Sequence, residues 1–559
     1  MARLTAALTR VGGNTLLSRL LGFVRDLLIA RLFGADAGTD AFLVAFKVPN
    51  FFRRLFGEGA FASALVPVLH DAERRGGQAE LRRLLDSLSG VMGVALLVLT
   101  VIGILTAPGI VLIIAPGFAG QPGHQALAVE LLRLTLPYVA LIVLAALAGA
   151  VLNLQERFGV PSFTPVLLNL AIIGSALWLA PRLEEPVLAL GWGVLLGGLV
   201  QLGFQLPFLG RLGLLPRPHL WPRPHGTHPG TLQILRRVGP VLFGVSVTQI
   251  NLLIDTFLAS FLAAGSISWL YYSDRLVEFP LGILGVALGT VILPRLSHQA
   301  AREPGFRVGQ TRTRSGRQGQ SAERALWLAG PGTTAGPCAS ESQVKDFSQT
   351  LDWALRLVML LGLPATVGLI TLAEPLVATL FFSAEFGERD VRMASMSLMT
   401  YATGLGAFMV IKILTPAYHA RGDARAPAYF GLVVLGVNLM MSLILMSPWG
   451  HAGLALGTSL AAWVNASLLL WGLGRQGVYR PAAEWRVLLL KAGVAALVLG
   501  IFLSWSPPPI ETWLRATAGK RPLWLLAWML AGAGFYFVTI LAMGVRPCHF
   551  VLASRDGSG

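Results

Sequence analysis

The sequence predicts an all-α polytopic membrane protein of about fourteen transmembrane helices, on three observations. Of its 559 residues, 54% are hydrophobic and 13% are charged, and the mean hydropathy is +0.67; a soluble domain has about 25% charged residues. Apolar runs of about 20 residues, the length that crosses a bilayer, recur from end to end. Short motifs also return in the same order in the two halves of the chain, which predicts two related lobes.

The apolar runs define fourteen predicted spans. They are residues 11–34, 39–70, 83–114, 124–152, 158–181, 185–206, 235–262, 268–299, 346–383, 388–419, 425–446, 450–473, 485–507 and 522–545. Lys and Arg concentrate in the even-numbered loops, with Arg515, Lys520 and Arg521 as the exception. Because cytoplasmic loops carry the excess positive charge, we expect both termini in the cytoplasm. The net charge of +16 is then loop charge, and no nucleic-acid partner is expected.

Internal repeats predict how the spans are grouped. The stretch "DLLIARLFG" at 26–34 resembles "NLLIDTFLA" 225 residues later, and "LALG" at 188–191 recurs 266 residues later. A Gly-, Arg- and Ser-rich stretch at 303–343 accounts for the difference, and its composition is typical of a disordered insertion. Each repeat holds six spans, so both halves enter the membrane from the same side. This predicts a pseudo-twofold axis along the membrane normal.

The predicted organisation therefore has four parts. They are an N-lobe at 1–210 with six spans, a cytoplasmic loop at 211–234, a C-lobe at 235–480 with six spans and the insertion 303–343, and a last part at 481–559 with two C-terminal helices and a tail.

Charged residues inside apolar spans are the candidate functional residues. The arginines Arg19, Arg25, Arg53 and Arg275 lie in the first, second and eighth spans, where a charge facing lipid costs about 2.5–3.5 kcal/mol. A planar guanidinium binds phosphate oxygens in pairs. The pattern predicts a cationic cavity between the lobes that holds a phosphate or pyrophosphate.

An alternative is that these arginines form internal salt bridges or extend to the membrane interface. The acidic residues available for such pairs are Asp26, Asp40, Glu58, Asp274 and Glu278. Pro49 and Pro280 lie close to the charges, and we expect both to break their helices.

Asp255 is a lone carboxylate in the apolar seventh span, "NLLIDTFLASFL". It is either a cation or proton site or a hydrogen-bonded packing residue. Lys412 either lines the cavity or pairs with Asp255. No metal site, nucleotide-binding loop or other cofactor motif is found, so transport would use an ion gradient, the membrane potential or a partner.

Three long motifs carry a family resemblance. The stretches "SRLLGFVRDLLIARLFGA", "TDAFLVAFKVPNFFRRLFGEGAFASALVPVL" and "SWLYYSDRLVEFPLGILGVALGTVILP" resemble the MurJ (MviN) family of lipid II flippases. The resemblance covers nearly the whole chain apart from 303–343. It implies the fold of the multidrug/oligosaccharidyl-lipid/polysaccharide exporters and a bacterial inner-membrane location.

The resemblance also implies a function. Such a flippase transfers lipid II, an undecaprenyl-pyrophosphate-linked disaccharide pentapeptide, from the cytoplasmic to the periplasmic leaflet for peptidoglycan synthesis. The expected partners are lipid II, membrane lipids and other cell-wall synthesis proteins. Spans 13 and 14 would form a hydrophobic groove for the lipid tail.

The residues that the resemblance assigns to substrate binding are Arg19, Arg25, Asp40, Arg53 and Arg275, to which we add Glu58 and Glu278 beside the arginines. Asp255 resembles a sodium-binding aspartate of some members. An ion-coupled exporter of drugs or of another lipid-linked oligosaccharide is the alternative, although a cavity for cationic drugs would carry acids. An enzyme is not expected, because a polyprenyl-phosphate glycosyltransferase would need a DxD-type cluster that the sequence lacks.

Overall fold

The computed structural model describes most of the chain and shows helices without strands in that part. The described residues are 2–57, 60–217, 229–234, 236, 253–301, 341–423, 425–482, 484–505 and 507–545. The candidate Glu58, most of the predicted insertion 303–343, and the seventh span before residue 253, apart from residue 236, lie outside them. Within the predicted loop 211–234, residues 229–234 are helical.

The first bundle is formed by the N-terminal helices. They are α1 (Ala2–Phe33), α2 (Ala37–Gly57), α3 (Ala60–Leu105), α4 (Ala107–Ile114), η1 (Pro116–Gly120), α5 (Pro122–Thr135), α6 (Pro137–Leu154), α7 (Gly159–Trp178), η2 (Ala180–Arg182) and α8 (Leu188–Arg211). Inside this bundle α7 packs on both α1 and α8, and α2 packs on α5 and α6. We call it the N-lobe.

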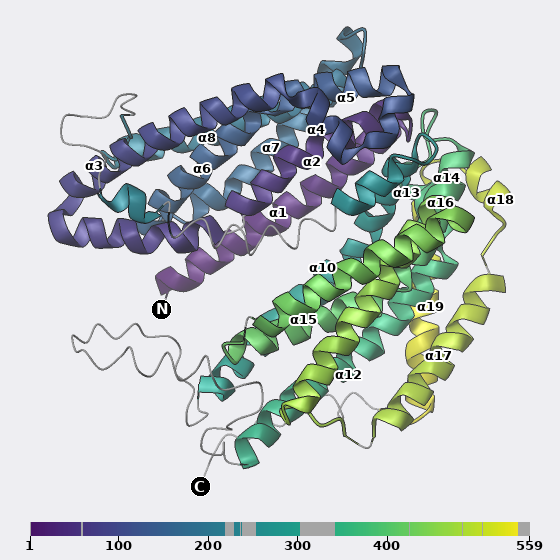
Figure 1. Cartoon of the computed structure of the whole chain (residues 1–559). Helices are drawn as coiled ribbons and strands as arrows, with labels where there is room; N and C mark the ends of the chain where they lie inside the picture. The colour runs from purple at the N-terminus through teal and green to yellow at the C-terminus, as the bar shows by residue number, and fades with distance from the viewer. Residues whose placement is uncertain are drawn as a thin grey trace.

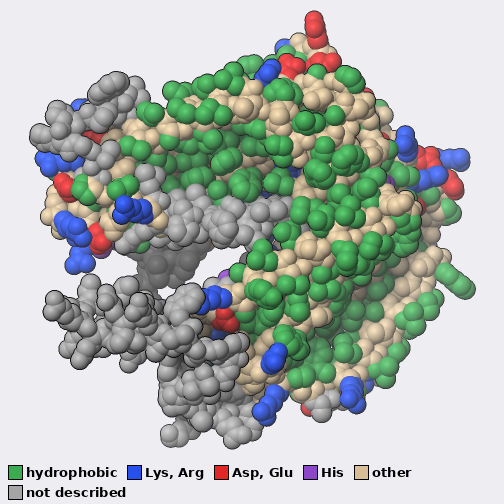
Figure 2. All heavy atoms as spheres, viewed as in Figure 1, with side chains coloured by type: hydrophobic (Ala, Val, Ile, Leu, Met, Phe, Trp, Pro, Cys, Tyr) green, Lys and Arg blue, Asp and Glu red, His purple; other side chains and the backbone are tan. Residues whose placement is uncertain are grey.

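Together with the helical residues 253–259, the second bundle holds the helices from α10 onward. They are α10 (Ser266–Ala301), α12 (Glu341–Thr371), α13 (Ala373–Phe381), α14 (Glu388–Ala402), α15 (Leu405–Ala420), α16 (Arg425–Arg475), α17 (Trp485–Trp505), α18 (Ile510–Arg515) and α19 (Lys520–Ala542). In this C-lobe α10 packs on α14 and α15, and α17 packs on α12 and α19. Figure 1 shows the two lobes converging where α4, α5, α13 and α14 lie and diverging toward the N-terminus. Figure 2 shows the cleft between them on the diverging side.

The helix breaks support the predicted repeat. Four predicted spans each contain a helix that is broken in two. They are 83–114, 124–152, 346–383 and 388–419. The breaks at Thr106 and Leu136 in the N-lobe recur at Leu372 and Thr403 in the C-lobe, which agrees with the offset of 266 residues found in the sequence. The two-lobed all-α fold is therefore confirmed.

Many of these helices have the length and apolar composition of membrane spans. In the part of the chain that the structure describes, eight helices are long and apolar enough to cross a membrane, or nine if the bent pair α14–α15 counts as one span. The helices α1, α2 and α10 are not among them; these are the helices that carry the candidate arginines. The total of fourteen stays a prediction.

Two predicted breaks are wrong. The helix α2 continues through Pro49, and α10 continues through Pro280. Neighbouring helices and side chains can satisfy the backbone groups that a proline frees in a membrane helix, so a proline alone does not end it.

The lobes meet through close backbone contacts at their converging end. Arg31 of α1 donates to the carbonyl oxygens of Thr379 and Leu380 in α13, over 3.1 and 2.7 Å. The backbone N–H of Gly117 in η1 donates to Ser260 Oγ over 3.0 Å. These contacts close one end of the molecule, whereas the other end stays open.

Gly117→Ala is expected to weaken this closed end. A Cβ on Gly117 would lie 2.0 Å from the carbonyl oxygen of Ser260, so one of the two lobes must move. Gly120→Ala, in the same short helix, is the matched control, because no atom lies within 4 Å of its Cβ position. Spin labels at Gln121 and Glu388 should report longer distances for Gly117→Ala only. Equal distance distributions in the two variants would contradict the expectation.

Candidate functional site

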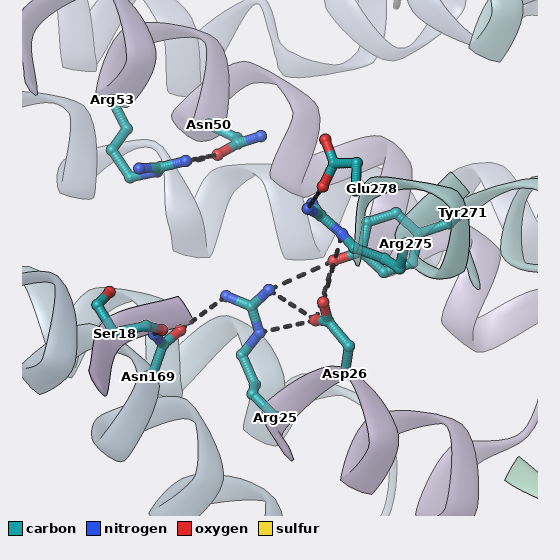
Figure 3. A network of polar contacts seen from close by, with 9 residues as sticks. All are labelled: Ser18, Arg25, Asp26, Asn50, Arg53, Asn169, Tyr271, Arg275 and Glu278. Atoms are coloured by element: carbon teal, nitrogen blue, oxygen red, sulfur yellow. Dashed lines mark hydrogen bonds and ion pairs between the residues drawn. The ribbon is translucent and has the colours of Figure 1, made fainter. Parts of the chain in front are cut away.

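A charged network joins the two lobes between α1, α7 and α10 (Figure 3). Arg25 of α1 donates to Oδ1 of its neighbour Asp26 through Nε and Nη2, over 2.9 and 2.6 Å. Its Nη1 donates to Asn169 Oδ1 of α7 over 3.1 Å, and Asn169 in turn donates to the carbonyl oxygen of Ser18. The Arg25 guanidinium is therefore held in one orientation by two helices of the N-lobe.

Tyr271 and Arg275 of α10 complete the network from the C-lobe. The Tyr271 hydroxyl donates to Asp26 Oδ1 over 3.0 Å and accepts from Arg25 Nη2 over 3.3 Å. Arg275 Nε lies 3.3 Å from Asp26 Oδ2, and its Nη1 lies 2.6 Å from Glu278 Oε2. The Arg275 guanidinium also lies over the Tyr271 ring, 4.9 Å from its centroid. Asp26 thus binds arginines from both lobes at once.

Exposure within the network increases toward the open end of the molecule. The side chain of Asp26 is 5% exposed, that of Arg25 12%, that of Arg275 25% and that of Glu278 44%. Arg275 is nine residues into α10, about 14 Å along the helix from its start at the closed end. A ligand that entered from the open side would therefore meet Glu278 and Arg275 before Arg25.

Arg19 and Arg53 lie near this network without belonging to it. Arg19 is exposed, and its Nη1 lies 3.1 Å from the position that a Cβ would take on Gly282 of α10. Among the described residues it has no hydrogen-bond or ion-pair partner. Arg53 Nε and Nη2 donate to Asn50 Oδ1 of the same helix, over 3.0 and 2.9 Å, and Figure 3 shows this pair apart from the other bonded groups.

Asp40 lies away from the arginines, at the closed end. This buried carboxylate accepts from the backbone N–H of Gly265 over 2.7 Å, and from the N–H and hydroxyl of Ser268 over 2.8 and 2.6 Å. It thereby binds the N-terminus of α10, where the helix dipole favours a negative charge. Gly265 has φ +94, and a Cβ there would lie 2.6 Å from the Ala35 carbonyl oxygen, so glycine is required. A substrate-binding role for Asp40 stays a prediction.

Asp255 lies in the helical residues 253–259 and contacts α16. Asn438 Nδ2 donates to its Oδ1 over 3.2 Å, and Thr458 Oγ1 donates to its Oδ2 over 3.4 Å. Ser442, one turn from Asn438, is buried, and its hydroxyl has no hydrogen-bond partner within the described ranges. Lys412 is exposed, and these contacts of Asp255 run to α16 rather than to Lys412. The described residues contain no group of three or more His, Cys, Asp or Glu that could hold a metal ion.

Two of the four arginines that the sequence singles out, Arg25 and Arg275, meet in this network, whereas the sequence does not predict the groups that orient them. Asp26 was considered only as an ordinary salt-bridge partner, and Asn169 and Tyr271 were not candidates. Arg25 and Arg275 form internal salt bridges, which is the alternative to a free cationic cavity, and both of them bind the carboxylate of Asp26. Asn169 is a polar residue within the apolar run "TPVLLNLAIIG", and such a residue in a membrane helix indicates a buried polar contact.

The network is suited to an anion with several oxygens. It contains planar guanidinium groups from both lobes, and Arg19 adds a further cation beside α10. A diphosphate could take bonds from Arg275 and Arg25 only in competition with Asp26 and Glu278. Binding would therefore alter the contact between the lobes as well as neutralise charge.

The chain matches one family of known proteins along most of its length. A family model described as "Lipid II flippase MurJ" matches residues 29–313 and 336–514. A "Probable lipid II flippase MurJ" of Haemophilus influenzae is 40% identical over 544 residues, which cover 96% of this chain and 99% of the relative. The corresponding protein of Vibrio cholerae is 41% identical, with 96% and 95% covered. The "Lipid II flippase MurJ" of Burkholderia cenocepacia is 37% identical, with 97% and 98% covered.

Solved structures agree on the fold. A structure titled "Lipid II flippase MurJ, inward closed conformation" superposes with a TM-score of 0.73 at 23% identity, covering 95% of this chain and 99% of that one. An inward-facing multidrug resistance MATE family transporter of the MOP superfamily gives a TM-score of 0.57 at 17% identity, covering 84% and 98%. At these identities the likeness concerns the fold alone.

Proposed function

Since the chain belongs to the lipid II flippase MurJ family, we propose that it carries lipid II from the cytoplasmic to the periplasmic leaflet by alternating access. The family is one of transporters rather than of enzymes. In this proposal the protein lies in a bacterial inner membrane with both termini in the cytoplasm. The open end of the lobes then faces the cytoplasm, where the substrate is made.

The observation that carries the proposal is the network of Arg25, Asp26, Tyr271 and Arg275 between the lobes. The pyrophosphate of the substrate binds Arg275 and Arg25, and Arg19 and Arg53 extend the positive surface. The sugar and peptide occupy the cleft, while the polyprenyl tail stays in lipid. Since Asp26 holds Arg25 and Arg275 together, its displacement by phosphate loosens the lobes and favours the next conformation.

Two sources of energy are proposed for the return step. Moving one charge through a membrane potential of 100 mV supplies about 2.3 kcal/mol, which would act on an arginine-rich site. A sodium ion or proton at Asp255 is the second source. Asp255, Asn438 and Thr458 supply the oxygen atoms that a hard cation prefers. The hydroxyl of Ser442, which has no hydrogen-bond partner among the described residues, lies one turn away on α16.

Leaflet-specific labelling of lipid II tests the function. Cells are depleted of their own flippase and rescued with this chain, and lipid II exposed to the periplasm is then measured. Rescue should restore exposed lipid II. If the chain reached the membrane and lowered drug accumulation but did not restore exposed lipid II, the exporter alternative would be favoured.

Asp255→Asn is expected to remove the cation dependence of transport. In liposomes, a tenfold gradient of a monovalent cation supplies about 1.4 kcal/mol, so transport by the unchanged chain should respond to an imposed sodium or proton gradient. Asp346→Asn makes the same charge change at an exposed position of α12 and should respond like the unchanged chain. If Asp255→Asn keeps the gradient response, the coupling cation does not bind at this site.

A further inference from the structure

The C-lobe contains an apolar cavity of about 240 Å³ away from the charged network. Its walls are one face of α12, the bend between α14 and α15, and Trp463 of α16. Gly362, Thr366 and Ile370 line it on α12, and Thr403 and Gly406 line it at the bend. An apolar cavity of about 150 Å³ stays dry and accepts a benzene-sized hydrocarbon, so a larger one accepts a longer apolar group.

A proline inside α12 and a bend between α14 and α15 border this cavity, and side chains of other helices bond to the backbone at both places. Pro364 leaves the carbonyl of Leu360 in α12 without its helical donor, and the Tyr536 hydroxyl of α19 donates to that oxygen over 2.9 Å. This carbonyl oxygen is therefore satisfied by α19, which contributes no residue to the cavity lining.

The other irregular point is the 45° bend between α14 and α15. Ser459 Oγ donates to the carbonyl oxygens of Thr400 and Tyr401, over 2.9 and 3.2 Å, and Trp463 Nε1 donates to that of Thr403 over 2.9 Å. Residues of α16 therefore hold the bend, and Trp463 both holds it and lines the cavity.

Glycines keep the cavity open. A Cβ on Gly362 would lie 3.2 Å from the Met409 sulfur, and one on Gly406 would lie 3.4 Å from Trp463 Cζ2. Trp463 is 40% exposed, as is Leu460. The C-lobe surface in Figure 2 is covered with hydrophobic side chains, and such a surface meets acyl chains in a bilayer.

We propose that the end of one phospholipid acyl chain occupies this cavity and supports the bent form of α14–α15. The lining carries no charged side chain that would bind a diphosphate. The charged network lies on α1, α7 and α10, none of which lines the cavity. These two facts favour a membrane phospholipid over the polyprenyl chain of the substrate. In this proposal the angle of the bend between α14 and α15 depends on the surrounding lipid, and alternating access changes that angle.

Photolabelling of the full chain in nanodiscs tests the proposal. The nanodiscs contain a phosphatidylethanolamine with a diazirine near the end of one acyl chain, and the labelled peptides are mapped. Adducts on residues 358–370 and on Trp463 should exceed those on the exposed side chains of α17, which are Leu489, Leu490, Val494 and Leu497. Gly406→Leu fills the cavity and should lower the cavity adducts roughly tenfold, the loss that about 1.4 kcal/mol of binding produces. Thr366→Phe is a second filling variant in case the first fails to fold.

Gly436→Leu is the matched control, because no atom lies within 4 Å of a Cβ at that position of α16. It should leave the cavity adducts unchanged. Equal labelling of the cavity in the filled variants and the unchanged chain overturns the proposal. Stronger labelling by a diazirine-bearing polyprenyl diphosphate also overturns it, because the occupant would then be the substrate tail.

Discussion

Arg275→Ala is expected to abolish the support of cell growth while the protein stays folded in the membrane. Arg275 binds Asp26 and Glu278 and stacks on Tyr271, so it is the C-lobe's cation at the junction of the network. The substitution removes the C-lobe cation that faces Asp26 and leaves Arg25 as the cation bonded to that carboxylate. The measurements are growth after depletion of the resident flippase and the amount of protein in the membrane.

Two controls separate headgroup binding from a structural loss. Arg475→Ala removes a surface guanidinium that lies 5.1 Å from the centroid of the Trp471 ring, and it should support growth. Arg275→Ala also takes one of two cationic partners from Asp26, so the double variant with Asp26→Asn removes the carboxylate charge that the lost arginine balanced. If the double variant grows normally, Arg275 serves only to neutralise Asp26. Normal cell-wall synthesis with Arg275→Ala alone would exclude the headgroup role.

Asp40→Ala is expected to open the closed end of the lobes. The substitution leaves the backbone N–H groups of Gly265 and Ser268 without their acceptor, and each orphaned buried donor costs about 1–3 kcal/mol. The equilibrium between closed and open forms should therefore shift at least about tenfold toward the open form. Spin labels at Gln121 and Glu388 measure the shift.

The labelled chain would have Cys338 and Cys548 replaced. The control is Asp423→Ala, because Asp423 also accepts from a helix N-terminus, through the N–H of Ala426, but at the exposed start of α16. It should leave the label distances unchanged. If Asp40→Ala keeps the closed distances yet abolishes flipping, then Asp40 acts on the substrate, as the family resemblance implies, and not on the junction.

The sequence by itself determined the fold class, the repeat and the charged helices. Apolar length and period fix which segments are helical in a membrane, because every backbone group must be satisfied within its own helix. The energetic cost of a charge in lipid then marks Arg25 and Arg275 as facing the protein interior. Neither inference depends on knowing which helices touch.

Only the tertiary structure decided which groups meet across the lobes. Residues as far apart in the chain as Asp26 and Arg275 become neighbours through the packing of α1 on α10, and no local pattern records that distance. The same holds for Asn169, whose amide orients Arg25 from α7. The sequence does not distinguish Asp40 from the other acidic residues of the apolar spans, but the fold places the N-terminus of α10 against its carboxylate. Pro49 and Pro280 show the converse, because packing overrides the local tendency of proline to end a helix.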